Sequence, residues 1–138
     1  MHHARKTTRQ EVMKIKKAYI AGAYTAKTPE EVEENVKRAE AVAWLYYLKG
    51  YAVFCPHAQT HRIHLRYNDD DVFEYEDWLR ADIAWLKECE VVVFVAGWEE
   101  SKGAKMEHVI AKAMGKEIHY LAEEEIQAFM AVMKDAKQ

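Results

Sequence analysis

Four short apolar runs alternate with longer amphipathic stretches along this chain of 138 residues. The runs are KAYIAGAY at 17–24, YAVFCP at 51–56, VVVFVAG at 91–97 and KEIHYLA at 116–122. VVVFVAG is β-branched and aromatic and too short for a typical helix, so it predicts a central strand buried on both faces. The order β-α-β-loop-α-β-α-β-α predicts an α/β sandwich in which helices cover a mainly parallel sheet of four or five strands.

The stretches between these runs carry the signals of helices. Thr28 suits an N-cap, Pro29 suits the first helical position, and Gly50 suits the left-handed residue that ends a helix. The polar segment HAQTHRIHLRYNDDD at 57–71 is expected to be a long loop with its acidic end in solvent. Helices are expected over residues 28–50, 72–90, about 104–114 and 123–138.

Length and composition favour one cytoplasmic domain. A chain of 138 residues fits a single domain, which we place at 17–138 after a loose arm at 1–16. Cys55 and Cys89 form no CxxC pair, and the polar start lacks the apolar core of a secretion signal. No apolar run reaches the roughly 18 residues of a membrane span, so no contact with a membrane is expected.

Charge and motif spacing exclude several classes of partner. The net charge is −3, with both signs scattered and no basic stripe, so we expect no binding to nucleic acid. His57, His61 and His64 match no recognised metal-ligand spacing, and no GxGxxG dinucleotide fingerprint occurs. We therefore expect no metal and no cofactor. A small nucleotide remains possible, because it needs only a local pocket.

In an open parallel sheet, ligands bind beyond the carboxyl ends of the strands, near the point where the strand order reverses. That rule selects residues that follow three of the apolar runs. Ser101 and Gly103 precede a helix start, where free N–H groups and the helix dipole favour a phosphate, although both residues also make ordinary caps. The substrate-binding residues expected from this rule are Gly22, Ala23, Tyr24, His57, Gly97, Trp98, Ser101 and Gly103.

Two carboxyl groups near these strand ends are candidate catalytic groups. On a helical wheel Asp82 lies in the middle of the apolar face of helix 72–90, where a carboxylate needs a partner or a shifted pKa. A purely structural role, in which Asp82 caps a loop or pairs with a buried arginine, explains this position equally well. Two interpretations of Glu107 compete. It is either a solvated glutamate in the first turn of a helix, where the helix dipole favours any acidic residue, or a nucleophile beside an anion-binding turn.

Three stretches together resemble the nucleoside 2-deoxyribosyltransferase superfamily, including its branch of 2′-deoxynucleoside 5′-phosphate N-hydrolases and its uncharacterised bacterial and phage members. They are YIAGAY, ADIAWLKECEVVVFV and SKGAKMEHVIAKAMGK, the last of which fits S-x-G-x-x-x-E before an alanine-rich helix. They span roughly residues 18–118. The resemblance implies a Rossmann-like or flavodoxin-like three-layer sandwich that cleaves an N-glycosidic bond.

The resemblance also implies catalytic roles. Glu107 matches the glutamate that attacks C1′ of the sugar, Asp82 the aspartate that holds the sugar or supplies a proton, and Tyr19 the tyrosine beside the nucleophile. A carboxylate can stabilise the positive charge that forms on the sugar or bond to C1′, while a second carboxyl handles the proton. Water as acceptor then gives hydrolysis, and another base gives transfer.

The same resemblance implies binding roles for three residues, and two stretches of the chain differ from the family pattern. Gly22 matches the glycine of the pocket floor, and Ser101 and Gly103 match the turn that holds a 5′-phosphate. Ala23-Tyr24-Thr25 replaces a polar loop that often carries serine or arginine in the family hydrolases. The segment 57–76 is longer and richer in histidine and acidic residues than in a compact hydrolase.

The resemblance implies a homo-oligomer, a dimer or tetramer. The helix around Trp44, Tyr46 and Tyr47 is a candidate interface, but a monomer with these side chains in its core is equally allowed.

Three functions compete for the same pocket. The leading one is an N-glycosidase or deoxyribosyltransferase that acts on a nucleotide or nucleoside, with the 5′-monophosphate favoured by the turn at Ser101. The alternative is a non-catalytic nucleotide-binding sensor in which Glu107 binds a ribose hydroxyl; binding without turnover distinguishes it. Cleavage of NAD ranks lower, because the dinucleotide fingerprint is missing.

Overall fold

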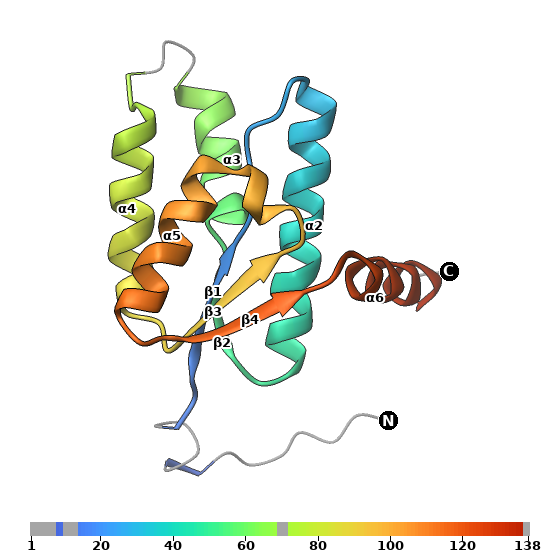
Figure 1. Cartoon of the computed structure of the whole chain (residues 1–138). Helices are drawn as coiled ribbons and strands as arrows, with labels where there is room; N and C mark the ends of the chain where they lie inside the picture. Colours follow the sequence, from blue (N-terminus) through green and yellow to red (C-terminus); the bar gives the residue numbers. More distant parts are fainter. Residues whose placement is uncertain (1–7, 10–13, 69–71, 137–138) are drawn as a thin grey trace.

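The computed structural model describes residues 8–9, 14–68 and 72–136. Within this part of the chain, four strands form one parallel sheet in the order β2-β1-β3-β4, and helices cover both faces (Figure 1). The fold is the expected three-layer α/β sandwich of the Rossmann-like or flavodoxin-like type. Most of the arm expected at 1–16 and the acidic residues 69–71 lie outside the described residues. The strands are β1 (Lys17–Ala21), β2 (Ala52–Phe54), β3 (Val91–Val95) and β4 (Glu117–Leu121).

In the described part of the chain, four helices and one short 3-10 turn connect these strands, and a fifth helix follows β4. The first helix starts as expected, because Thr28 Oγ1 accepts a hydrogen bond from the Glu31 N–H at 3.1 Å. Gly50 follows its end with a φ of 98°, the left-handed conformation that glycine adopts most easily. The elements are α2 (Pro29–Leu48), α3 (Pro56–Tyr67), α4 (Tyr75–Lys87), η1 (Trp98–Glu100), α5 (Lys102–Ala113) and α6 (Glu123–Ala136).

The expectation of a loop at 57–71 is wrong, because α3 occupies most of this segment. Pro56 starts the helix, where its fixed φ is suited to the first turn. His57, His61 and His64 follow at intervals of four and three residues, which places them on one helical face. His57 and His61 are buried. The sequence did not predict this helix, because its buried face carries histidines and a search for apolar residues at helical spacing does not count them.

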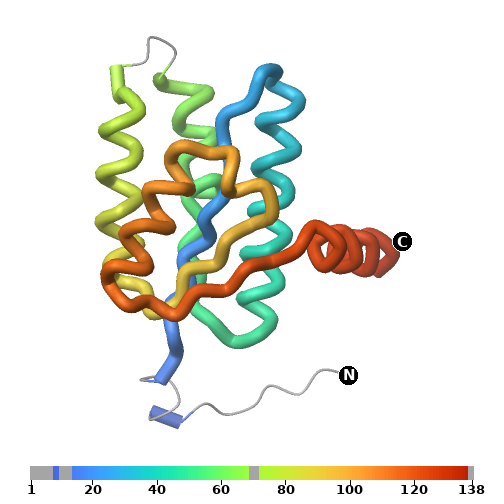
Figure 2. The backbone as a smooth tube through the Cα atoms, viewed as in Figure 1, coloured from blue at the N-terminus to red at the C-terminus, as the bar shows by residue number. Residues whose placement is uncertain are grey.

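Two apolar cores pack against the two faces of the sheet. On one face, Val42 of α2 and Ile126 of α6 join the core with Ile20 of β1. On the other face, Leu86 of α4 and Ala111 of α5 join Phe94 of β3. Figure 2 shows how the helices divide between the two faces, with α6 beside α2 and away from α4. All five residues of β3 are buried, as expected of a central strand.

The strand order reverses between β1 and β3, which is where ligands bind in such sheets. The chain leaves β1 through Gly22, and a Cβ at this position would lie 3.1 Å from Val95 Cβ. That distance is shorter than an ordinary carbon–carbon contact, so only glycine fits without a shift of β3. Gly22 therefore lets the two strand ends approach each other closely at the edge of the crevice.

The outer face of α2 is partly apolar. Tyr46 is buried, whereas Trp44 and Tyr47 are 50% and 52% exposed, so the core interpretation holds for Tyr46 alone. Among the residues described, no helix has both the length and the apolar character that crossing a bilayer requires.

Candidate active site

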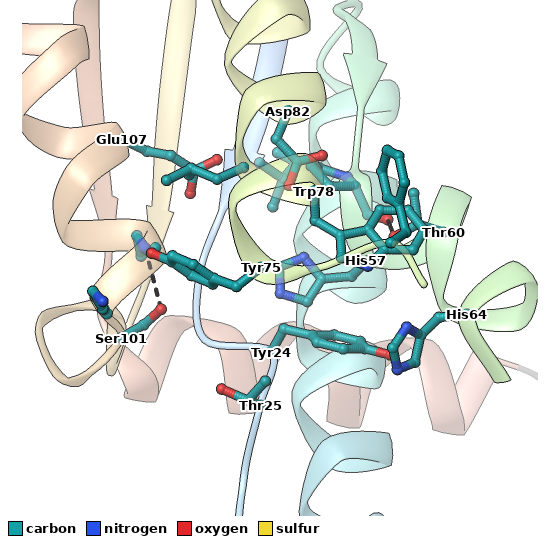
Figure 3. A pocket seen from close by; sticks show the side chains of 18 of the residues that line it. Tyr24, Thr25, His57, Thr60, His64, Tyr75, Trp78, Asp82, Ser101 and Glu107 are labelled. Atoms are coloured by element: carbon teal, nitrogen blue, oxygen red, sulfur yellow. Dashed lines mark hydrogen bonds between the residues drawn. The ribbon is translucent and has the colours of Figure 1, made fainter. Parts of the chain in front are cut away.

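A cavity of about 450 Å³ opens beyond the carboxyl end of β1. Its walls come from the loop after β1, from α3 and α4, and from the start of α5 (Figure 3). Segments that are far apart in the sequence therefore meet at the edge of the sheet that the strand-end rule selected. The expected site residues that line this cavity are Gly22, Tyr24, His57, Asp82, Ser101, Gly103 and Glu107.

Tyr19, in the middle of β1, holds Glu107 at the cavity. The fully buried Tyr19 donates its hydroxyl proton to Glu107 Oε2. Burial and the charges of Glu107 and Asp82 raise the pKa of Tyr19 well above its usual value, so the hydroxyl remains a donor. Because α5 begins at Lys102, Glu107 stands in the second turn and is only 6% exposed. The interpretation as a solvated first-turn glutamate is therefore wrong.

Glu107 and Asp82 both have pKa values raised by burial into the neutral range. Burial raises the pKa of Glu107 to about 8; the Tyr19 hydrogen bond lowers this pKa, and the charge of Asp82 raises it. Burial also raises the pKa of Asp82 to about 7. The charge of Asp82 also disfavours ionisation of Glu107, so the double carboxylate is disfavoured at neutral pH. The cavity can thus present one carboxylate and one carboxylic acid together.

The start of α5 forms a polar end of the cavity that suits an anion. Ser101 is the N-cap, and its Oγ accepts a hydrogen bond from the Ala104 N–H at 3.1 Å. Gly103 was expected to precede the helix, but it lies inside the first turn. The N–H groups of Lys102 and Gly103 have no carbonyl to bond within the helix, so an anion can accept from them. Lys102 adds positive charge, with its Nζ 5.1 Å from the centre of the Tyr75 ring.

The opposite end of the cavity is lined by aromatic rings and histidines (Figure 3). Trp78 makes edge contacts with His64 and Phe73, with ring centres 5.9 and 4.7 Å apart. Tyr24 makes an edge contact with His64 at 6.2 Å. Such ring surfaces favour a planar, partly apolar ligand group.

His57 lines the cavity and is held there by the backbone that follows β1. Its Nε2–H donates to the Ala23 carbonyl at 2.9 Å, so Ala23 takes part through its backbone and does not line the cavity itself. Burial lowers the pKa of His57, which keeps the ring neutral and leaves a lone pair on Nδ1. This buried Nδ1 has no hydrogen-bond partner among the described residues.

Two expected site residues lie away from the cavity. Gly97 and Trp98 line a separate hollow together with Tyr120. The Trp98 ring packs against Phe94 and His108, with ring centres 5.0 and 4.3 Å apart. Gly97 has a left-handed φ of 94° and begins the η1 turn. Both residues shape the connection from β3 to α5 and not the cavity wall.

The sequence reasoning missed part of the cavity lining. Thr60 and His64 were missed because a loop was expected in place of α3, although their spacing from His57 follows a helical face. Trp78 stands four residues before Asp82 and thus one turn along the same face, a signal that the sequence did contain. Across the residues that the structure covers, no three His, Cys, Asp or Glu side chains gather as a metal ion would require. The lining residues that were missed include Thr60, His64, Phe73, Tyr75, Trp78 and Lys102.

A protein-family model described as "Domain of unknown function (DUF4406)" matches residues 16–120. The matched region contains all the cavity residues named above. A comparison with curated proteins found no match. The family description names no reaction, so the chemistry has to be inferred from the geometry of the cavity.

Proposed function

The chain belongs to the DUF4406 family, and we propose that it cleaves the N-glycosidic bond of a nucleoside or (deoxy)nucleoside 5′-monophosphate. The observation that carries this proposal is the presence of Glu107 and Asp82 at one cavity, with Tyr19 bonded to Glu107. Glycosidic cleavage commonly uses two carboxyl groups at one site, one as a carboxylate and the other as a carboxylic acid. The proposal agrees with the resemblance to the nucleoside 2-deoxyribosyltransferase superfamily.

In the proposed reaction, Glu107 is the nucleophile. Tyr19 bonds Oε2, which leaves Oε1 of the carboxylate to approach C1′ of the sugar. As the C1′–N bond breaks, its electron pair goes to the leaving base, which takes the proton of Asp82. The resulting glycosyl ester is then opened by water, whose proton returns to Asp82, or by a second base. The first acceptor gives hydrolysis and the second gives transfer.

The two ends of the cavity favour a 5′-monophosphate. The N–H groups at the start of α5 and the Lys102 ammonium provide donors and positive charge for a phosphate. The aromatic end around Trp78 provides flat surfaces for a base. Figure 3 shows Glu107 on the Ser101 side of the cavity and Asp82 beside Trp78, so a nucleotide that spans the cavity would pass its sugar along these two carboxyl groups.

A non-catalytic nucleotide sensor is the alternative function. The raised pKa of Glu107 favours it, because a protonated carboxyl is a poor nucleophile but a good partner for a ribose hydroxyl. In this case the protein would bind nucleotides in the same cavity and release no base.

A chromatographic turnover assay tests the proposal. Wild-type protein would be incubated with ribo- and deoxyribonucleoside monophosphates, the matching nucleosides and NAD, each with and without a second free base. Glu107→Gln should release no base, whereas the exposed Glu100→Gln on the adjacent turn should behave as wild type. Equal activity of Glu107→Gln and wild type would overturn the assignment. Silence of wild type across the panel, with binding retained, would establish the sensor.

We also propose that the protein is a cytoplasmic homo-oligomer. Both cysteines are free and buried, which suits a reducing compartment. The half-exposed Trp44 and Tyr47 on α2 offer an apolar surface for a second copy. Light scattering of the purified chain measures the assembly directly, and a monomeric mass would contradict it.

A further inference from the structure

Tyr24 is held in the cavity wall by residues from two different helices. Its hydroxyl lies 2.8 Å from His61 Nδ1 on α3, and His61 Nε2 lies 3.0 Å from Glu33 Oε2 on α2. The backbone of Tyr24 is fixed as well, because its carbonyl accepts a hydrogen bond from Asn35 Nδ2 at 3.1 Å. Glu33 does not line the cavity, yet it is joined to the cavity wall through this series of bonds.

The hydrogen bonds from Tyr24 to Glu33 have a defined direction when His61 is neutral. A carboxylate only accepts, so the Nε2 that faces Glu33 must carry the ring proton. The other ring nitrogen, Nδ1, then has a lone pair and accepts the Tyr24 hydroxyl proton. His61 is 7% exposed and has a partner on both nitrogens, so its ring orientation is fixed.

The Tyr24 ring is also packed edge-on against three histidines of α3. The ring centres of His57, His61 and His64 lie 5.8, 5.6 and 6.2 Å from that of Tyr24. Residues 23–25 and the histidine-rich segment are the two stretches where this chain departs from the superfamily that it resembles. Their mutual contact makes them a single unit, and this unit forms one wall of the cavity.

We propose that Tyr24 positions the planar ring of the ligand, and that Glu33 and His61 are positioning residues that hold Tyr24 ready for it. The identity of that ring as a nucleobase rests on the proposed function. Tyr24 lies on the side of the cavity that also carries Trp78 (Figure 3). Stacking on a ring that is already ordered avoids the entropy loss of immobilising a mobile side chain.

The size of the effect follows from that entropy. Immobilising one side chain on binding weakens affinity by about three- to tenfold, so loss of the Glu33 bond should raise KM and Kd by this factor. The value of kcat should stay unchanged, because Glu33 touches neither the cavity nor the two catalytic carboxyls.

Three substitutions on α2 test the proposal. Glu33→Ala removes the acceptor for His61, Glu33→Gln retains an acceptor oxygen, and Glu34→Ala removes a neighbouring exposed carboxylate that lies 3.7 Å from Lys37. KM and kcat would be measured on the best monophosphate of the turnover panel, and Kd by calorimetry in the non-cleaving Glu107→Gln background. We expect Glu33→Ala alone to raise KM and Kd by three- to tenfold.

The possible results separate failure of the positioning role from failure of the glycosidic function. An unchanged Kd in Glu33→Ala, or a fall in kcat at constant Kd, overturns the positioning role of Glu33 and His61 while leaving the glycosidic function in place. Failure of Glu33→Gln to restore wild-type values overturns the role assigned to the acceptor oxygen. Binding without base release in wild type overturns the glycosidic function, and the Kd series still tests whether Glu33 holds Tyr24 in place for the ligand. If wild type neither binds nor cleaves any member of the panel, both proposals are overturned.

Discussion

Replacing Glu107 with glutamine should stabilise the fold while it abolishes the proposed reaction. Glutamine has the same shape, and its amide oxygen can still accept the Tyr19 hydroxyl proton. The wild-type carboxyl is buried, and burial raises its pKa from the ordinary 4.5 to about 8. The folded protein therefore resists an ionisation that the unfolded chain undergoes freely.

The sign and size of this effect follow from proton linkage. Because the folded pKa is the higher one, the favourable contribution is complete below pH 4.5 and is lost as the pH rises through about 8. Each pH unit in this interval lowers the free energy of unfolding by about 1.4 kcal/mol. At pH 7 the loss is at most about 3 kcal/mol, and coupling to Asp82 reduces it, so Glu107→Gln should gain about 1–3 kcal/mol.

Urea unfolding at several pH values checks this prediction. Wild type, Glu107→Gln and the exposed control Glu100→Gln would be unfolded at about pH 4.5, 7 and 8, the interval over which the two Glu107 pKa values separate. The gain of Glu107→Gln should be near zero at the lowest pH and largest at the highest. A gain that does not depend on pH, or a loss of stability at pH 8, would refute the reasoning.

Three other substitutions report on the remaining features of the site. The profile of kcat/KM against pH should be a bell with its maximum between about 7 and 8. The reactive state, with Glu107 ionised and Asp82 protonated, reverses the order of the two pKa values, so a minority of the molecules holds it and that minority is largest in this interval. Initial rates of Asp82→Asn should lack the alkaline limb. Gly103→Asp should raise the calorimetric Kd of a monophosphate by about tenfold or more and that of the nucleoside far less, because it puts like charges together; equal losses would contradict a phosphate at this turn. Gly22→Ala should lower the free energy of unfolding in urea by about 1–3 kcal/mol, because its Cβ would meet Val95 at 3.1 Å; unchanged stability would contradict that close approach.

The sheet and the two carboxyl groups were predictable because each depends on a pattern within one element. The apolar residues of β3 are consecutive, and no helix of that length would bury them all. Asp82 was identifiable because it interrupts an apolar helical face. The strand-end rule then needed only the element order to bring Asp82, Gly22 and Glu107 to one edge of the sheet.

The rest of the site depends on contacts that no local pattern records. The bond between Tyr19 and Glu107 joins residues 88 positions apart, so only the resemblance pointed to it. Trp98 was expected at the site because it follows β3, but the left-handed Gly97 turns the chain so that Trp98 packs on Phe94. α3 was missed because histidines fill its buried face, where aliphatic residues usually give the signal.

The position of β1 in the sheet has a consequence for how a cell makes this protein. Of the four strands described, β1 leaves the ribosome first, yet it lies between β2 and β3, and its Ala18 pairs with Val91. One edge of this apolar strand therefore stays unpaired until β3 has been synthesised, and an unpaired strand edge promotes aggregation. A delay in the synthesis of β3 should therefore lower the yield of correctly folded protein.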